Sequence, residues 1–171
     1  EESVRAANPE VIYAVVSAFG ADGPFAERTG IDVIFQAESG MMSLTGDPGS
    51  PPGKTATTIG DYVAATNTAL GICAALAGRA SGGRGRRVDV SLRDSLIAVQ
   101  AGWNAIAFDI DAQPEKTGTA SPFLAPNRMF ETADGHFVIA IVSDRHFRVM
   151  CEALGRADLV DPFLGNDARL A

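Results

Sequence analysis

A junction at residues 57–62 (TTIGDY) separates a loop rich in proline and glycine from a long alanine-rich segment. The segment from Asp61 to about Arg79 is apolar nearly all round and crowded with small side chains, so it predicts one long helix buried on most faces. The glycines and arginines of residues 81–87 then suit a left-handed cap and the negative end of the helix dipole. A helix of this kind requires other elements to pack closely against it.

Asp61 lies in the first turn expected for this helix. Unpaired backbone N–H groups and the positive end of the helix dipole favour a negative charge there, so we place the chemistry at this carboxylate. Aspartate is also one of the preferred helix-capping residues, and caps greatly outnumber catalytic carboxylates. The spacing alone therefore leaves two alternatives open, an active carboxylate and a structural cap.

Length and charge restrict the classes of protein to which the chain can belong. Its 171 residues allow one domain or a little more, and 46% hydrophobic with 20% charged residues is ordinary globular composition. A net charge of −7 argues against a nucleic-acid surface, and we expect no nucleic-acid partner. The Gly/Arg-rich residues 82–87 are accordingly read as a cap and turn rather than as an RNA-binding segment.

Several features indicate a reducing, non-membrane setting. Cys73 and Cys151 lie far apart without metal-ligand spacing, so we expect two buried thiols, no metal site and a cytoplasmic location. Residues 63–78, the most apolar stretch, fall short of the roughly 20 residues that cross a bilayer, so no membrane partner is expected. The start has neither a signal-peptide pattern nor a methionine, and the chain looks like an excised piece of a longer one.

The order of the expected elements indicates an α/β fold. The β-branched and aromatic run 11–19 predicts a strand covered on both faces, as in a parallel sheet, and residues 20–24 form a loop at its carboxyl end. Further expected elements are a strand at 88–90 and helices over 1–7, 32–42 and 91–108.

After residue 110 the pattern changes. We expect a connector over 111–125 and the start of a small α+β domain over 126–171, after part of a large domain over 1–110. Strands at 128–131 and 136–142 flank Asp134-Gly135, a hairpin signal because Asp-Gly supplies positive φ in a tight turn. A helix of about a dozen residues is expected from Ser143-Asp144, and His136 and His146 are read as surface or structural residues.

A phosphate-binding loop at Gly53-Lys54-Thr55 is disfavoured. The first glycine of that motif would be residue 48, which is proline, and Pro51 and Pro52 remove further N–H donors. Lys54 is therefore either a solvated loop lysine or a single charge that meets a phosphate or a carboxylate.

An ordered set of short motifs resembles the family III CoA-transferases, also called the CaiB/BaiF family. The matching stretches are NP at 8–9, VIYAVVSAFG at 11–20, GP at 23–24, GIDVIFQAESG at 30–40, TG at 45–46, PP at 51–52, GD at 60–61, GRGRRVDVSL at 83–92, LAPNRMF at 124–130 and ADGHFVIA at 133–140. They cover nearly the whole chain in the family's order. Family members are considerably longer, so an N-terminal and a C-terminal portion are expected to be missing.

The resemblance implies a Rossmann-like large domain and a specific role for Asp61. The family aspartate at this position is the nucleophile, which forms a mixed anhydride with the acyl group and then an aspartyl-CoA thioester. Arg28, Ile31, Lys54 and Gly60 are the residues we expect at the substrate or CoA site, with N–H donors for the oxyanions near Gly60. The substrates implied are an acyl-CoA and a carboxylic acid acceptor, with no tightly bound cofactor, in an interlocked homodimer.

Two other functions remain open. The α-methylacyl-CoA racemases resemble the chain over the same landmarks, but their histidine falls at Ile31, which cannot carry a proton. A non-catalytic acyl-CoA-binding or assembly domain, in which Asp61 only caps its helix, is the alternative of another class. The family's glycine-rich active-site loop is not found in the chain, so we expect the isolated chain to be inactive.

Overall fold

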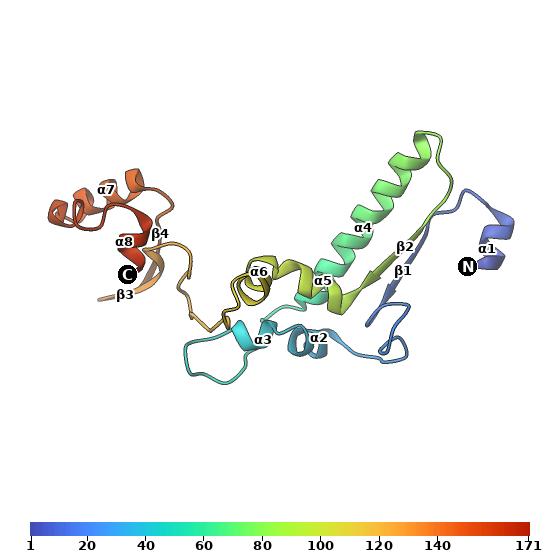
Figure 1. Ribbon diagram of the computed structural model, residues 1–171, viewed down its shortest axis with the longest axis horizontal. Helices are drawn as coiled ribbons and strands as arrows, with labels where there is room; N and C mark the ends of the chain where they lie inside the picture. Colours follow the sequence, from blue (N-terminus) through green and yellow to red (C-terminus); the bar gives the residue numbers. More distant parts are fainter. The chain divides into compact units, whose positions relative to one another are not determined.

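The computed structural model describes all 171 residues, which form two compact units. Unit 1 comprises residues 1–45 and 51–115, and unit 2 comprises residues 46–50 and 116–171 (Figure 1). Helices and strands are mixed in both units, as the predicted α/β class requires. The domain limits expected from the sequence remain a prediction about the whole protein.

Unit 1 is built on two parallel strands and one long helix. Strand β1 (Tyr13–Ser17) pairs with β2 (Arg87–Ser91), which confirms the predicted parallel sheet. Helix α4 (Ile59–Ala80) packs against both strands (Figure 1). The helix lies so close to β2 at Gly71 that a Cβ added there would be only 2.6 Å from Val88 Cγ1. The expectation that β1 is covered on both faces is wrong within this chain, since Val16 is half exposed.

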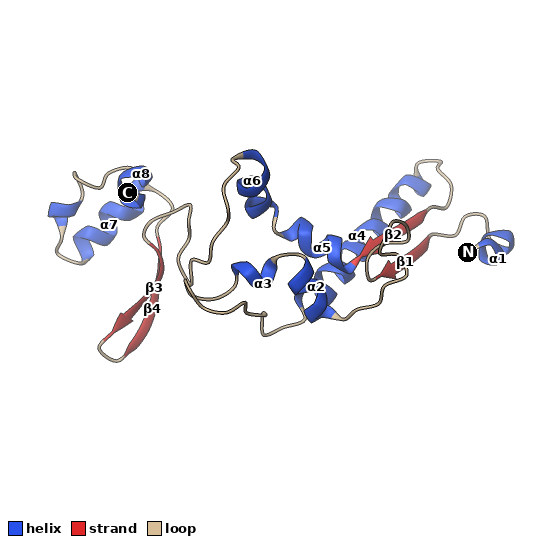
Figure 2. Ribbon diagram, turned by 60° about the horizontal axis from the view of Figure 1, so that its bottom comes forward, coloured by secondary structure: helices blue, strands red, loops and turns tan.

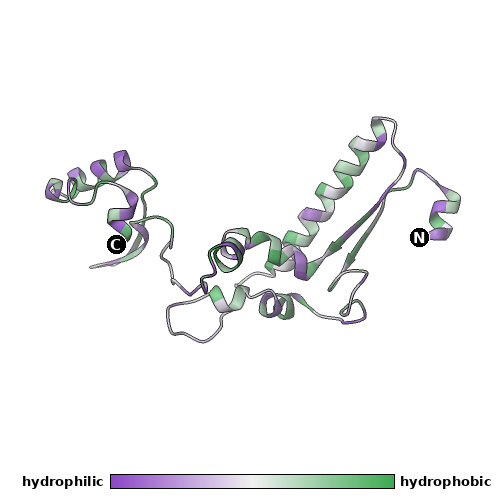
Figure 3. Cartoon of the chain, in the orientation of Figure 1, coloured by the Kyte–Doolittle hydropathy of each residue, from purple (hydrophilic) through white to green (hydrophobic).

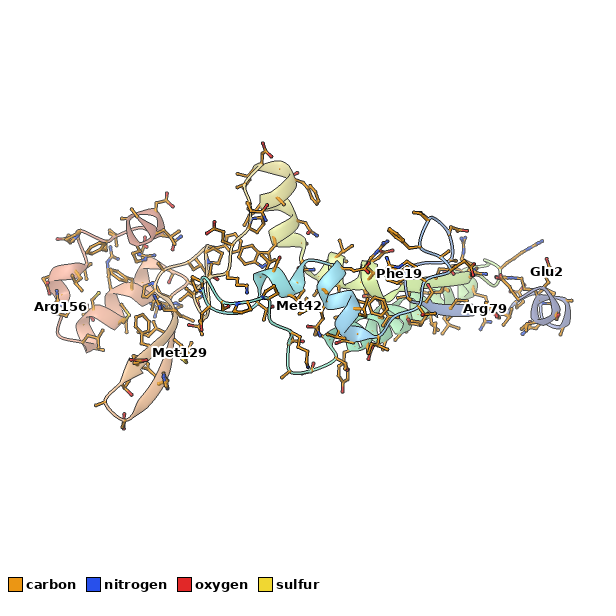
Figure 4. The ribbon with its side chains drawn as sticks, turned by 90° about the horizontal axis from the view of Figure 1, so that it is seen from below. Glu2, Phe19, Met42, Arg79, Met129 and Arg156 are labelled. Carbon is orange, nitrogen blue, oxygen red and sulfur yellow. The ribbon has the colours of Figure 1, made fainter.

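The remaining helices of unit 1 are short. They are α1 (Glu2–Ala7), α2 (Asp32–Glu38), α3 (Met41–Leu44), α5 (Leu92–Val99) and α6 (Ala101–Asp109). The predicted helix over 32–42 is divided because Gly40 takes a φ of 84°, and the one over 91–108 is divided at Gln100. Phe19 (labelled in Figure 4), Phe35 and Leu96 form the buried core between these segments.

Helix α4 is far less buried than its composition predicts. Only Gly60, Ala64 and Ala75 are buried along its 22 residues, although most of the helix is apolar or weakly polar (Figure 3). Tyr62, Leu70 and Leu76 are exposed, and so is Cys73, which corrects the expectation of a buried thiol there. The helix is also longer than the apolar run suggested. It is long and apolar enough to cross a membrane by length and composition alone, which is weak evidence for a span.

Unit 2 joins a hairpin to short helices (Figure 2). Strands β3 (Asn127–Thr132) and β4 (Gly135–Ala140) pair antiparallel, followed by α7 (Asp144–Ala153), a 3-10 turn (Ala157–Leu159) and α8 (Asn166–Leu170). The predicted hairpin is confirmed, but the reason given for it is wrong: no residue of its turn has positive φ. Ile141, Phe147 and Cys151 form the buried core.

Candidate functional site at the start of helix α4

The first turn of α4 is capped by a residue that is distant in the sequence. Thr58 occupies the cap position, but its side chain makes no capping hydrogen bond. Instead the backbone N–H of Gly60 donates to Asp32 Oδ1 at 2.7 Å. A carboxylate at the positive end of a helix dipole stabilises that end, and here it comes from the first turn of α2.

Asp32 and Gln36 form a buried polar network behind this turn. Gln36 Nε2 donates to Asp32 Oδ2 at 2.6 Å, and Gln36 Oε1 accepts from the backbone N–H of Thr55 at 2.9 Å. The exposed fractions of Asp32 and Gln36 are 8% and 0%. Gln36 Nε2 also lies 3.4 Å from the carbonyl oxygen of Thr57. Buried polar groups that are satisfied in this way hold the segment 55–60 in one conformation.

Asp61 lies one residue beyond the capped Gly60 and is exposed. Its carboxylate makes no hydrogen bond or ion pair, and its backbone N–H has no partner either. The alternative in which the Asp61 side chain caps the helix is therefore wrong for this structure, because Asp32 has that role. The carboxylate of Asp61 is therefore accessible to a molecule that enters from solvent.

A cleft of about 310 Å³ brings together three of the residues predicted for the site. It is lined by Ile31, Asp32, Val33, Lys54, Thr58 and Asp61. Lys54 is the one cation in this lining, and its Nζ makes only a long contact of 3.5 Å with the Thr55 carbonyl oxygen. The cleft thus combines two carboxylates, one ammonium group and an apolar wall.

Two other predicted residues have different positions or roles. Arg28 does not line the cleft: its guanidinium pairs with Glu38 and lies 4.5 Å from the centre of the Phe19 ring. The N–H of Gly60 is occupied by Asp32, so among the N–H groups near Gly60 the one without a partner in this turn is that of Asp61. Gly60 is instead needed for space, because a Cβ there would lie 2.9 Å from Asp32 Oδ1.

Asp32 and Gln36 were missed as site residues in the sequence. They fall in a segment whose apolar spacing predicts an ordinary core-facing helix. The available signal was a pair of polar residues four positions apart, which share one face of a helix, in a mostly apolar run.

A second cleft, in unit 2, contains none of the predicted residues. It has a volume of about 410 Å³ and a mainly apolar lining that includes Phe147, Leu159 and Phe163. Its Arg169 side chain is 4% exposed and donates to the Ala125 carbonyl oxygen and to Asp144. No group of three or more histidine, cysteine, aspartate or glutamate side chains gathers where it could hold a metal ion.

Similar proteins match this chain over nearly its whole length. The succinate–glutarate CoA-transferase of Agrobacterium fabrum is 35% identical over 172 residues, which cover 99% of this chain and 43% of that protein. The acetyl-CoA:oxalate CoA-transferase of Acetobacter aceti is 34% identical, with 99% of this chain and 44% of that protein covered. The chain spans less than half the length of these relatives.

A solved structure of the same family has a similar fold. A CaiB/BaiF family protein from Brucella suis superposes with a TM-score of 0.80 at 34% identity, covering 99% of this chain and 46% of that one. The model of CoA-transferase family III matches residues 1–171. The chain therefore belongs to CoA-transferase family III.

Proposed function

We propose that the whole protein transfers coenzyme A between carboxylic acids, with Asp61 as the nucleophile. The observation that carries this proposal is an exposed carboxylate without a partner, in a cleft and next to a turn that other residues hold in place. Relatives named for CoA transfer to or from succinate, glutarate and oxalate support the reaction class.

The proposed reaction passes through two covalent states of Asp61. A carboxylate oxygen of Asp61 attacks the acyl-CoA carbonyl, which forms a mixed anhydride and expels CoA thiolate. The thiolate attacks the Asp61 carbonyl, giving an aspartyl-CoA thioester and the free donor acid, which leaves with one oxygen of Asp61. The acceptor carboxylate then attacks this thioester, and the returning thiolate attacks the acceptor carbonyl of the second anhydride. Covalent catalysis divides one difficult exchange into easier steps.

The cleft offers groups suited to these steps. An anionic acceptor must approach a site that already holds the carboxylates of Asp32 and Asp61, and the ammonium of Lys54 offsets part of that charge. The backbone N–H of Asp61, which has no partner in this turn, is the donor that we propose for an oxyanion formed nearby. Ile31, which is 70% exposed, presents an apolar surface to the acyl group or to CoA.

Hydroxylamine trapping in the whole protein tests this proposal. With acyl-CoA present, hydroxylamine should convert the Asp61 side chain to a hydroxamate, detected by mass spectrometry. A racemase would leave Asp61 unmodified and exchange the substrate α-proton with deuterated water. We expect the hydroxamate without α-exchange, because Ile31 cannot carry a proton. Rapid α-exchange with an unmodified Asp61 would overturn the proposal.

We also propose that the whole protein is a homodimer and that the isolated chain is inactive and self-associates. The exposed apolar side chains of α4, among them Tyr62, Leu70 and Leu76, form a surface of the kind that other chain segments cover. Light scattering of the isolated chain at high concentration tests the proposed self-association. A strictly monomeric isolated chain would contradict it.

A further inference from the structure

We propose that Asp32 and Gln36 are positioning residues for the nucleophile: their hydrogen-bond relay holds the turn 55–60 so that Asp61 is presented without a partner of its own. This inference rests on the proposed role of Asp61. It adds two residues, 29 and 25 positions upstream, that act through the first turn of α4 and not on the substrate.

The polarity of the relay is fixed by its end groups. The Gly60 N–H can only donate, so it requires an acceptor on Asp32, and the Thr55 N–H likewise requires Gln36 Oε1. The amide nitrogen of Gln36 must then face Asp32 Oδ2, as the 2.6 Å contact shows. Reversing the Gln36 amide alone would place its nitrogen against the Thr55 N–H and its oxygen against Asp32 Oδ2, which would break the relay.

The relay also explains why Asp61 keeps no partner. A helix start leaves backbone N–H groups unsatisfied, and an aspartate in the first turn is well placed to accept from them. Here the Gly60 N–H is satisfied by Asp32 and that of Tyr62 by the Thr58 carbonyl oxygen. These N–H groups therefore do not need the Asp61 carboxylate as an acceptor, and it remains available as a nucleophile.

A polarity swap in the whole protein tests the inference. Asp32→Asn places an amide nitrogen against that of Gln36, and Gln36→Glu places a second carboxylate against Asp32. We expect each single variant to slow Asp61 hydroxamate formation by about 10- to 100-fold, the size expected for losing a hydrogen bond to a charged group. The reduction should be in kcat, with little change in KM.

The double variant Asp32→Asn with Gln36→Glu restores every donor to an acceptor and keeps the net charge. Only the long contact to the Thr57 carbonyl is lost, so the rate should return to within about fivefold of the wild type. Matched controls are Asp22→Asn and Gln113→Glu, which make the same chemical changes at exposed positions outside the cleft.

Each outcome decides the question. Single variants that fold and acylate Asp61 at the wild-type rate would overturn the inference. So would a folded double variant that stays as slow as Asp32→Asn, because the negative charge at position 32 would then itself be required. If a single variant does not fold, the double variant alone decides. A wild-type protein that forms no hydroxamate would instead refute the proposed function.

Discussion

Helices α4 and α7 both begin with an aspartate in the first turn, and the two aspartates have opposite surroundings. In α7, Ser143 caps locally by accepting from the His146 N–H at 3.3 Å. Asp144 is then engaged by Arg169 at 2.9 Å and by the Gly165 N–H at 3.2 Å. In α4 the cap comes from Asp32, and Asp61 has no partner.

The presence or absence of a partner distinguishes a structural carboxylate from a candidate nucleophile. At α7 the cap serine and the first-turn aspartate both make hydrogen bonds that hold the fold, and the pKa of Asp144 is lowered chiefly by the hydrogen bond from Arg169. At α4 a distant residue supplies the capping bond, so the local carboxylate contributes little to folding. A first-turn aspartate without a partner, beside a cap from elsewhere, is therefore the feature to look for.

Replacing Asp61 should have the largest effect on activity. Asp61→Ala in the whole protein is expected to lower transfer by more than about a thousand-fold, because the covalent route is removed. Since the side chain has no partner, the free energy of unfolding should change by no more than about 1 kcal/mol. Rate assays and urea denaturation measure the two effects. Retained activity, or a variant that does not fold, would remove the contrast with Asp144.

Replacing Gly60 should disturb the distant cap directly. In Gly60→Ala the new Cβ would lie 2.9 Å from Asp32 Oδ1 and 3.2 Å from Leu96 Cδ1. We expect a loss of about 1–3 kcal/mol in the free energy of unfolding, together with slower acylation of Asp61. The matched control is Gly102→Ala in α6, where a Cβ meets nothing within 4 Å. Gly102→Ala should raise the free energy of unfolding by about 0.5–1 kcal/mol. Equal effects at Gly60 and Gly102 would contradict the expected clash at Gly60.

Removing the hydroxyl groups at the two cap positions should show that the two helices are capped differently. Ser143→Ala is expected to destabilise the protein by about 0.5–2 kcal/mol, because it removes the bond to the His146 N–H. Thr58→Ala should change the free energy of unfolding by less than about 0.5 kcal/mol, since the Thr58 side chain caps nothing. Urea denaturation of both variants gives the comparison. A larger loss at Thr58 would show that α4 relies on a local cap after all.

The smallest expected effect is a pH dependence at α7. Because the folded-state pKa of Asp144 lies below its ordinary value of 3.8, its ion pair contributes stability above that pH. The contribution is lost as the pH falls through the lowered pKa. The difference in unfolding free energy between the wild type and Asp144→Asn should therefore be constant down to about pH 4 and shrink below it. A difference that does not change with pH would show that the Arg169 interaction does not depend on the charge.

Local patterns predicted most of the fold, and they failed where distant contacts decide. The parallel strands and α7 follow from β-branched runs and a serine cap close in the sequence. The Asp134-Gly135 pair located the hairpin correctly, although its turn does not use the positive φ that was expected. The exposure of α4 did not follow, because composition does not reveal which partners are present within the chain. At the site, Asp61, Ile31 and Lys54 were predicted and do share a cleft, whereas Asp32 and Gln36 act across 28 and 19 residues.

The most direct test of the nucleophile is the transfer of oxygen from the acceptor to Asp61. Trypsin releases residues 55–79 as one peptide, in which Asp61 is the only acidic side chain. After a single turnover with an acceptor whose carboxylate carries heavy oxygen, we predict that this peptide gains one heavy oxygen atom, because the acceptor leaves one oxygen on Asp61 when the second anhydride is resolved. Transfer that proceeds with an unlabelled Asp61 would show that Asp61 is not the nucleophile.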